Sequence, residues 1–438
     1  MGLKVAKFGG SSVADAIQLM KIKEIIEADD EMRYVVVSAP GKRFSGDTKI
    51  TDLLYLCKTH MDHNVPYDQL LQVIEDRYVA AAVSLGIDVD YEREFDIIKA
   101  AMADGTATAD YLASRGEYLN AILVAKLLGY DFVDAFSMIR FNKKGKLDDA
   151  ETDRLMSQEL AKHENAVIPG FYGQDIDGRV KTFSRGGSDI TGAVVARAVK
   201  ADMYENWTDV SGFLVADPRI VPEAKPMANV SYQELRELSY MGASVLHDEA
   251  IYPVKSADIP INIRNTNRPE DPGTIISTEG DRSGNRPITG IAGSKNFTSI
   301  NISKSMMSTE VGFIRRMTAI LEDFGVCVEH VPSGVDTVSV IVSNREVEGK
   351  LDEILEEMER VLKPDTLEIN DNISVIATVG EGMAYKPGTA ARLFTALAEA
   401  EINIKMIDQG SSEINIIVGV ENKDFEKAVK AIYDAFEF

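Results

Sequence analysis

Two glycine-containing turns carry the residue types that bind anions. The first is Lys7-Phe8-Gly9-Gly10-Ser11, and the second is Ser184-Arg185-Gly186-Gly187-Ser188-Asp189. Each follows a short apolar run, places a cation before two glycines and opens a predicted helix. Glycines let backbone N–H groups approach a ligand closely, and a helix N-terminus adds unpaired donors and the positive end of its dipole. Two such turns predict that two anionic groups are brought together, as phosphoryl transfer onto an acid requires.

Four residues of these turns can act on such groups. Lys7 can reach a transferred phosphoryl group while glycine N–H groups hold its oxygens, although a solvated lysine beside a tight turn would look the same. Arg185 can hold a carboxylate through two hydrogen bonds, which lysine cannot. Ser188 and Asp189 start the next predicted helix, where they either bind ligand or cap the helix.

Further polar residues follow a strand predicted over residues 202–207. Thr208 and Asp209 end it, and the loop beyond contains Asp217-Pro218-Arg219. Polar residues at the carboxyl end of a strand in an open α/β sheet are typical of a nucleotide pocket, although an ordinary loop is the alternative. Glu117 can bind an amine or serve as an acidic residue in the first turn of a helix. The sequence has no Walker-type phosphate loop and no protein-kinase motif set.

Composition excludes several classes of protein. The chain has 438 residues and a net charge of −23, which argues against nucleic acid as a partner. It has no run of 18 apolar residues, so we expect no membrane span. The two cysteines, Cys57 and Cys327, form no CxxC pair, which argues against a zinc site or a disulfide framework. We expect a cytoplasmic protein.

The pattern of elements predicts an α/β domain followed by a repeat. Strands alternate with helices over residues 1–280, which indicates an open, mostly parallel sheet covered by helices on both faces. Turn-forming residues dominate 265–296, where we place the domain boundary. Beyond it, a strand–helix–strand–strand–helix pattern occurs twice, which predicts two ferredoxin-like α+β modules, 297–370 and 371–438, that can intertwine. Residues 326–331 are one of the strands predicted there. Repeated small modules of this kind are more often regulatory than catalytic.

Together these motifs resemble the aspartate kinase (aspartokinase) family. The matching segments run in the expected order over nearly the whole chain: Lys7 to Val13, Arg115-Gly116-Glu117, Arg185 to Asp189, Trp207-Thr208-Asp209, Asp217-Pro218-Arg219 and Met241 to His247. The C-terminal repeat resembles the paired ACT modules of that family, which bind amino-acid effectors. The likeness is to monofunctional, lysine-sensitive members, because the chain is too short to include a homoserine dehydrogenase.

The resemblance implies ATP-dependent phosphorylation of the L-aspartate side-chain carboxylate to 4-phospho-L-aspartate, the first step of lysine, threonine and methionine biosynthesis. Mg²⁺ is expected with ATP; no protein ligand is assigned to it, and Asp189 is the candidate. The implied catalytic residues are Lys7, Asp189 and Arg185. The implied aspartate-binding residues are Thr51, Glu117, Arg185 and Ser188. The implied nucleotide-binding residues are Lys7, Phe8, Gly9, Gly10, Thr208, Asp209, Leu214, Asp217, Pro218, Arg219 and Ser244.

One departure from the family pattern concerns the nucleotide site. Ser244 stands where most relatives have a lysine that reaches the ATP phosphates. Lys255 and Arg219 are candidates to replace that cation. So are Lys42 and Lys49, in the polar segment 41–49 that we predict to be a lid.

The resemblance also implies an effector site and an oligomer. The residues that align with lysine-contacting positions are Met307, Gly312, Phe313, Ile314, Val328 and Glu329. Glu329 suits an ammonium group, whereas Phe313, Ile314 and Val328 could equally be module core. Because ACT modules pair between subunits, a homodimer or homotetramer is expected. Two other functions stay open: an amino-acid kinase for a different acid, and a catalytically weak amino-acid sensor, which Ser244 alone favours.

Overall fold

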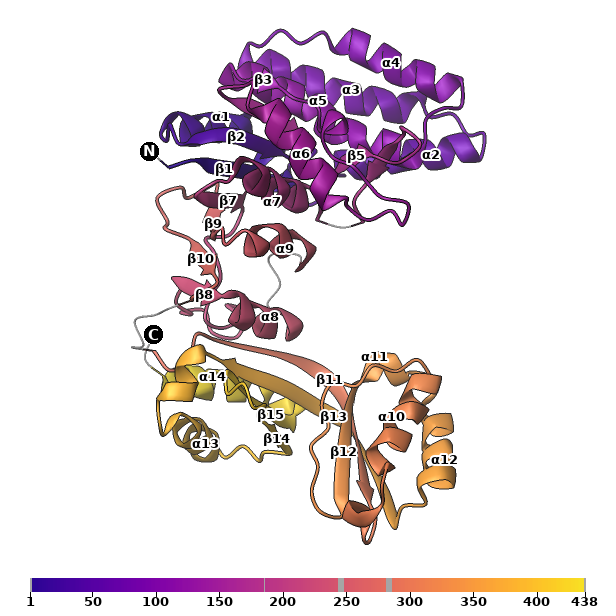
Figure 1. The fold of residues 1–438 in the computed structure, drawn as a ribbon, viewed down its shortest axis with the longest axis vertical. Helices are drawn as coiled ribbons and strands as arrows, with labels where there is room; N and C mark the ends of the chain where they lie inside the picture. Colours follow the sequence, from indigo (N-terminus) through magenta and orange to yellow (C-terminus); the bar gives the residue numbers. More distant parts are fainter. Residues whose placement is uncertain (1, 185, 243–247, 281–285, 437–438) are drawn as a thin grey trace. The chain divides into compact units, whose positions relative to one another are not determined.

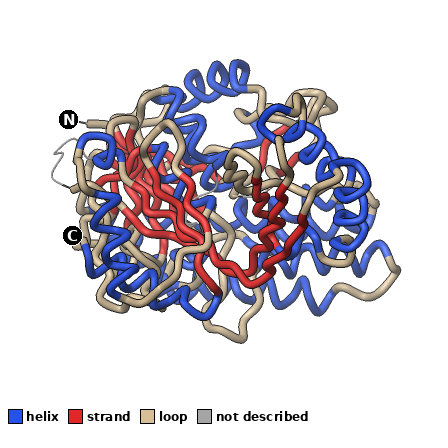
Figure 2. The backbone as a smooth tube through the Cα atoms, turned by 90° about the horizontal axis from the view of Figure 1, so that it is seen from below, coloured by secondary structure: helices blue, strands red, loops and turns tan. Residues whose placement is uncertain are grey.

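The computed structural model describes residues 2–184, 186–242, 248–280 and 286–436. The chain divides into two compact units (Figure 1). The first unit comprises Met1–Phe213, Pro226–Tyr232 and Val245–Asp281, and the second comprises Leu214–Lys225, Gln233–Ser244 and Arg282–Phe438. Figure 2 shows the strands gathered into sheets with helices around them. Within the described ranges, no helix is long and apolar enough to cross a membrane.

The first unit contains a mostly parallel sheet of eight strands, as predicted. The strand order is β3-β4-β2-β1-β7-β9-β10-β8, and of the paired neighbours only β9 and β10 run antiparallel. The strands are β1 (Lys4–Phe8), β2 (Met32–Val37), β3 (Asp131–Phe132), β4 (Ala166–Pro169), β7 (Met203–Thr208), β8 (Asn229–Ser231), β9 (Ile261–Asn265) and β10 (Thr274–Ser277). The short strands β5 (Tyr172–Gln174) and β6 (Val180–Thr182) pair separately. Strands β1, β2 and β4 are buried almost throughout, which explains their continuous apolar runs.

Helices cover both faces of this sheet. On one face lie α1 (Ala16–Glu27), α2 (Ile50–Asp62), α3 (Asp68–Leu85), α4 (Tyr91–Ala103) and α5 (Ala109–Leu128), which share one hydrophobic core with Phe8 and Trp207. The other face carries α7 (Gly187–Val199), which packs on β1, β2 and β7 and contacts α6 (Asp149–Leu160) and α9 (Asp248–Ser256). The helix predicted to open at the first glycine turn begins only at Ala16, because Gly10–Val13 forms a 3-10 helix and Asp15 caps α1 by accepting from Gln18 N.

The second unit is built on one antiparallel sheet of five strands, in the order β12-β11-β13-β15-β14. These are β11 (Gly290–Ser303), β12 (Thr337–Ser343), β13 (Thr366–Val379), β14 (Met406–Asp408) and β15 (Asn415–Glu421). Its helices are α10 (Phe313–Asp323), α11 (Asn344–Val347), α12 (Leu351–Leu362), α13 (Thr389–Glu399) and α14 (Phe425–Ala435). Helix α8 (Tyr232–Tyr240) belongs to this unit from Gln233 onward. Strand β13 runs through residues 370 and 371, so both predicted modules contribute to one sheet.

One predicted strand of this unit is wrong. Residues 326–331 form no strand; His330 makes a single bridge to Ile341 of β12. Val326 is buried in the core formed by α10, α12 and the sheet, whereas Cys327 is exposed. The segment therefore contributes side chains to the core and pairs with β12 at one place, where Glu329 N donates to Ile341 O and Ile341 N donates to His330 O, both at 2.9 Å; this pairing is too short to form a strand. The module boundaries stay a prediction.

Candidate active site

The register of β1 against β7 brings Lys7 and Asn206 together. The strands run parallel with Lys7 opposite Asn206 and Phe8 opposite Trp207. Successive side chains of a strand point to opposite faces. Phe8 and Trp207 stack, with ring centroids 5.9 Å apart, in the core beneath α1 to α5. Lys7 and Asn206 therefore face α7, and their side chains are buried there.

Helix α7 supplies the acidic partner of Lys7. It begins after Gly186, whose φ of 58° is left-handed and therefore suits glycine. Asp189 lies in the first turn, and its Oδ1 is 2.5 Å from Lys7 Nζ. The same oxygen accepts a hydrogen bond from Asn206 Nδ2 at 2.9 Å. Within the described ranges Asp189 makes no capping bond to α7, so its carboxylate serves the lysine rather than the helix end.

The first glycine turn lies beside this ion pair. Gly9 N donates to Trp207 O at 2.9 Å, which fixes the turn against the end of β7. Gly41 N donates to Gly10 O at 2.8 Å, and a Cβ on Gly41 would lie 2.7 Å from the Gly10 carbonyl carbon. Only glycine allows this approach. The first N–H groups of the 3-10 helix Gly10–Val13 have no intrahelical acceptor, so they can bind an anion next to Lys7.

Glu117 is a buried carboxyl group close to the same turn. It lies on α5, is 5% exposed and interacts with the backbone N–H of Ala39. Burial raises the pKa of Glu117 to about 8, against the lowering effect of that hydrogen bond. Its Oε2 has no hydrogen-bond partner among the described residues. A buried carboxyl with an unpaired oxygen suits a ligand ammonium, which would restore the ionised form.

Ser188 and Thr51 border this edge of the sheet. Ser188 is buried against Gly170. A side chain at position 170 would clash with it, because a Cβ added to Gly170 would lie 2.6 Å from Ser188 Oγ. Gly170 N in turn donates to Val37 O at 3.0 Å, at the end of β2. Thr51 is half-buried in the first turn of α2. Ser188 therefore lies where β2 and β4 end, and Thr51 follows Ile50, whose backbone N–H donates to Pro40 O beyond the end of β2 at 3.2 Å.

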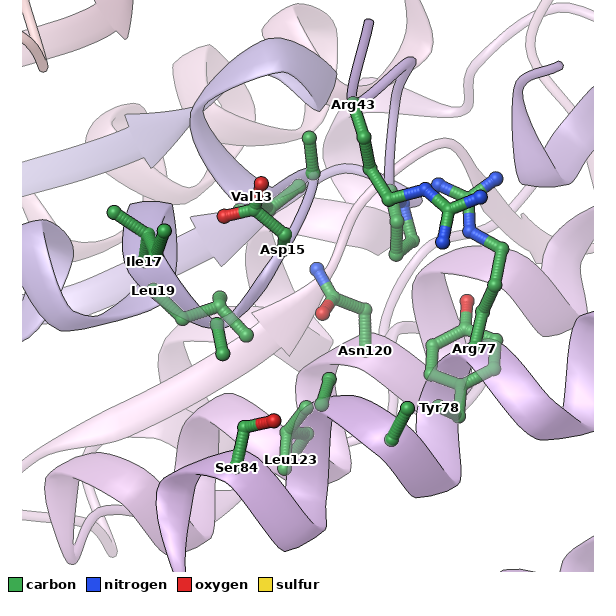
Figure 3. A pocket seen from close by; sticks show the side chains of 15 residues that line it. Val13, Asp15, Ile17, Leu19, Arg43, Arg77, Tyr78, Ser84, Asn120 and Leu123 are labelled. Carbon is green, nitrogen blue, oxygen red and sulfur yellow. The ribbon is translucent and has the colours of Figure 1, made fainter. Parts of the chain in front are cut away.

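The predicted lid is an anchored loop. Arg77 of α3 donates to Thr48 O at 2.7 Å and to Gly41 O at 2.8 Å. Arg43 holds Asp47 through both carboxylate oxygens, and this guanidinium keeps the pKa of Asp47 well below its usual range. Figure 3 shows the guanidinium groups of Arg43 and Arg77 side by side at a cavity of about 270 Å³ behind the loop. Asn120, also on the cavity wall, donates to Ser38 O at 2.7 Å.

The predicted nucleotide residues fall in different parts of the chain. Thr208 is the last residue of β7 and Asp209 follows it; Thr208 Oγ1 donates to Asp209 Oδ1 at 3.2 Å. Leu214, Asp217, Pro218 and Arg219 belong to the second unit, where Arg219 pairs with Asp217 at 2.5 Å and is largely exposed. Arg185 and Ser244 lie outside the described residues.

Comparison with known proteins identifies the family. Residues 2–265 match the amino acid kinase family, and residues 376–436 match an ACT domain. Aspartokinase 3 of Bacillus subtilis (strain 168) is 38% identical over 448 residues, which cover 99% of this chain and 98% of the relative. The chain belongs to the aspartokinases. It is therefore an aspartate kinase, an enzyme of amino-acid biosynthesis, and the predicted fold of an amino-acid-kinase domain with a C-terminal ACT domain is confirmed.

Solved structures of aspartokinases agree with this assignment. The aspartate kinase of Clostridium acetobutylicum is 51% identical and superposes with a TM-score of 0.92 over 100% of both chains. Escherichia coli aspartokinase III is 25% identical. Its complex with aspartate and ADP superposes with a TM-score of 0.71 over 99% of both chains. Its complex with lysine and aspartate gives 0.73 over 99% of this chain and 100% of that one.

The predicted effector residues of this aspartokinase divide into core and surface. Met307 and Phe313 are buried in the core of the second unit, and Val328 packs against that core. Ile314 is 46% exposed, so it is not a core residue of the module, which was the alternative to a role in effector binding. Gly312 precedes α10 with a left-handed φ of 81°.

Glu329 has a partner that sequence reasoning did not find. Its carboxylate accepts a hydrogen bond from the hydroxyl of Tyr240, at the end of α8. That hydrogen bond is the main reason that the pKa of Tyr240 rises to about 12. Tyr240 is largely exposed, so the pair is open to solvent.

Sequence reasoning also missed Asn206 and Arg77. The only sign of Asn206 in the sequence is a polar residue inside a predicted strand. Its contact with Lys7 depends on the register of β7 against β1, which the sequence does not specify. Arg77 lies on an ordinary amphipathic helix, and its contacts with the lid loop come from the packing of α3.

Proposed function

We propose that this aspartokinase transfers the γ-phosphoryl group of ATP to the side-chain carboxylate of L-aspartate, giving ADP and 4-phospho-L-aspartate. The observation that carries the proposal is the buried Lys7–Asp189–Asn206 cluster beside the Gly9-Gly10 turn. A carboxylate with a pKa of ~4 is already ionised at neutral pH, so no strong general base is needed. Catalysis then depends on positioning and charge neutralisation. The complex of E. coli aspartokinase III with aspartate and ADP supports this reading.

The proposed roles follow from charge and burial. Lys7 neutralises the transferring phosphoryl group, with Asp189 holding the lysine. Glu117 receives the ammonium of aspartate, because its carboxyl is buried with one oxygen unpaired among the described residues. The remaining roles are proposed from the family resemblance. Arg185, Ser188 and Thr51 would hold the rest of aspartate, and Phe8, Gly9, Gly10, Thr208, Asp209, Leu214, Asp217, Pro218, Arg219 and Ser244 would line the nucleotide pocket.

Magnesium is proposed to enter with the nucleotide. The described residues form no group of three or more His, Cys, Asp or Glu side chains that could hold a metal. Mg²⁺ is commonly bound through one or two carboxylates together with substrate phosphates. Asp189 fits this pattern, because among the described residues its bonds to Lys7 and Asn206 use Oδ1, which leaves Oδ2 as a candidate ligand.

Regulation is proposed to act through the C-terminal modules. The solvent-open carboxylate of Glu329 suits the ammonium of L-lysine as the inhibitor, and the complex of E. coli aspartokinase III with lysine and aspartate supports that choice over threonine. The modules at 297–370 and 371–438, following a catalytic domain at 1–280, would pair subunits into a homodimer or homotetramer. Inhibition would then reflect a higher affinity of lysine for an inactive arrangement. Cytoplasmic location stays a prediction.

The first experiment is an ADP-release assay with Mg-ATP and L-aspartate, with and without L-lysine. Aspartate-dependent turnover that lysine suppresses supports both the kinase reaction and the effector. A panel of other acids, including L-glutamate and N-acetylglutamate, tests the alternative substrates. Absence of turnover with any acid, together with calorimetric binding of lysine, would support the sensor function instead.

A further inference from the structure

Asn206 is the uncharged member of the buried cluster that it forms with Lys7 and Asp189. It sits on β7 in register with Lys7 and is 4% exposed. Its Nδ2 donates to Asp189 Oδ1 at 2.9 Å, and its Oδ1 accepts from Lys7 Nζ at 3.3 Å. Both ends of the amide are therefore used, and each faces the charge that it can satisfy. The opposite amide orientation would place a donor against the ammonium and an acceptor against the carboxylate.

This arrangement limits the directions in which Lys7 can donate. An ammonium group has three N–H donors and no acceptor. Asp189 Oδ1 and Asn206 Oδ1 are its partners among the described residues, so one donor is left for a ligand. With two partners the ammonium has a defined orientation, whereas Asp189 alone would leave it free to rotate about one contact. The side chains of Lys7 and Asp189 are 8% and 16% exposed, so water competes little for these bonds.

We propose that Asn206 is a positioning residue for the kinase reaction: it fixes the Lys7–Asp189 pair so that the third N–H of Lys7 faces the phosphoryl group being transferred. The inference rests on the proposed role of Lys7. It differs from that role because both ends of the Asn206 amide are bonded to Lys7 and Asp189, so Asn206 acts through these two charged side chains. If Lys7 loses its exact position, the rate of the chemical step should fall more than substrate binding weakens, because a charge-stabilising group acts mainly on the transition state.

The variant Asn206→Leu tests this role, because leucine keeps the approximate shape and removes both hydrogen bonds. We expect kcat to fall about 10- to 100-fold while KM for L-aspartate changes by less than about threefold. Asn262 on the neighbouring strand β9 is a matched control. It is also a buried sheet asparagine, and its Nδ2 donates to Pro272 O rather than to the cluster. Asn262→Leu should keep kcat within about twofold of wild type.

The variant Asn206→Asp tests the role through the pH dependence of activity, which would not change if Asn206 were purely structural. The introduced carboxylate, when ionised, would face the carboxylate of Asp189 in a buried site; both effects raise its pKa, and we expect them to outweigh the lowering effect of Lys7, whose charge Asp189 already neutralises. Once protonated, the introduced carboxyl can donate to Asp189 and accept from Lys7, as asparagine does. The activity of Asn206→Asp relative to wild type should therefore rise as pH falls. This pH series keeps the inference testable even if Asn206→Leu does not fold, which circular dichroism would show.

Three results would overturn the inference: a folded Asn206→Leu with kcat within twofold of wild type, a loss no larger than that of Asn262→Leu, or an Asn206→Asp pH profile parallel to wild type. Lys7→Met separates this failure from failure of the proposed site. If Lys7→Met stays active, the role of Lys7 is wrong. If Lys7→Met is inactive and the Asn206 variants behave like wild type, only the role of Asn206 is wrong.

Discussion

Lys7 Nζ lies 2.5 Å from Asp189 Oδ1, so the end of β1 and the first turn of α7 are joined by a buried ion pair. Lys7→Met keeps much of the apolar stem and removes the charge. We expect kcat to fall by at least about 100- to 1,000-fold, the usual cost of removing a group that stabilises transition-state charge. Steady-state ADP release measures this loss.

The same substitution should destabilise the fold, because the Asp189 carboxylate would keep, among the described residues, only the hydrogen bond from Asn206. Removing one partner of a buried pair costs up to roughly 3–5 kcal/mol. Adding Asp189→Asn to Lys7→Met removes the unpaired charge, so stability should recover in urea unfolding while activity does not. Recovery of activity in the double variant would contradict a catalytic charge on Lys7.

Glu117 makes aspartate binding depend on pH. Its pKa of about 8 means that the free enzyme holds a proton there at pH 7, and a bound ammonium should expel it. Affinity for L-aspartate should therefore rise between pH 6 and 8, by at most about tenfold per pH unit. Calorimetry in buffers of different ionisation enthalpy should show release of up to about one proton at pH 7. Glu117→Gln should bind aspartate weakly and release none, whereas unchanged proton release would exclude Glu117 as the group.

Glu117 should also lower stability as pH rises. Its pKa in the folded protein is raised from 4.5 to about 8, so the folded state holds the proton more tightly than the unfolded state. The free energy of unfolding then falls between those two values, by up to about 1.4 kcal/mol per pH unit. In thermal unfolding, the Tm of Glu117→Gln minus the Tm of the wild type should be more positive at pH 8 than at pH 5. Equal differences at both pH values would contradict the buried, protonated carboxyl.

The sequence was sufficient for the sheet and the family but not for the contacts within the site. Apolar runs and glycine turns predicted β1, β7 and the start of α7, because burial and backbone freedom are local requirements. The pairing of Lys7 with Asp189 depends on strand order and register, which local patterns do not specify. The strand predicted at 326–331 is wrong for a related reason: its apolar residues signal burial, and burial here comes from core packing, with backbone pairing to β12 limited to Glu329 and His330 against Ile341.

Arg77 should control the mobility of the lid loop. Its guanidinium holds the carbonyl groups of Gly41 and Thr48, near the two ends of segment 41–49, whose trypsin sites are Lys42, Arg43 and Lys49. Arg77→Met keeps the packing of the stem and removes both hydrogen bonds. We expect faster tryptic cleavage within 41–49 and a KM for L-aspartate raised by about two- to tenfold, since each lost hydrogen bond is worth ~1 kcal/mol. Unchanged cleavage would show that the loop is held by Arg43 and Asp47 instead. Lys99→Met, which removes a surface pair with Glu75, is the control.

Tyr240 should set the sensitivity to the effector. Its hydroxyl donates a hydrogen bond to the Glu329 carboxylate, so the ammonium group of an incoming lysine must displace that hydrogen bond. Tyr240→Phe keeps the ring and removes the competitor, so half-maximal inhibition by L-lysine should need about two- to fivefold less lysine, from a net hydrogen-bond value of ~0.5–1 kcal/mol. Glu329→Ala should act in the opposite direction and relieve inhibition with little change in the uninhibited rate. Inhibition curves for both variants test the pair together. If Tyr240→Phe weakens inhibition as Glu329→Ala does, the hydroxyl supports the inhibited state rather than competing with lysine; if neither variant shifts the curve, the effector binds elsewhere.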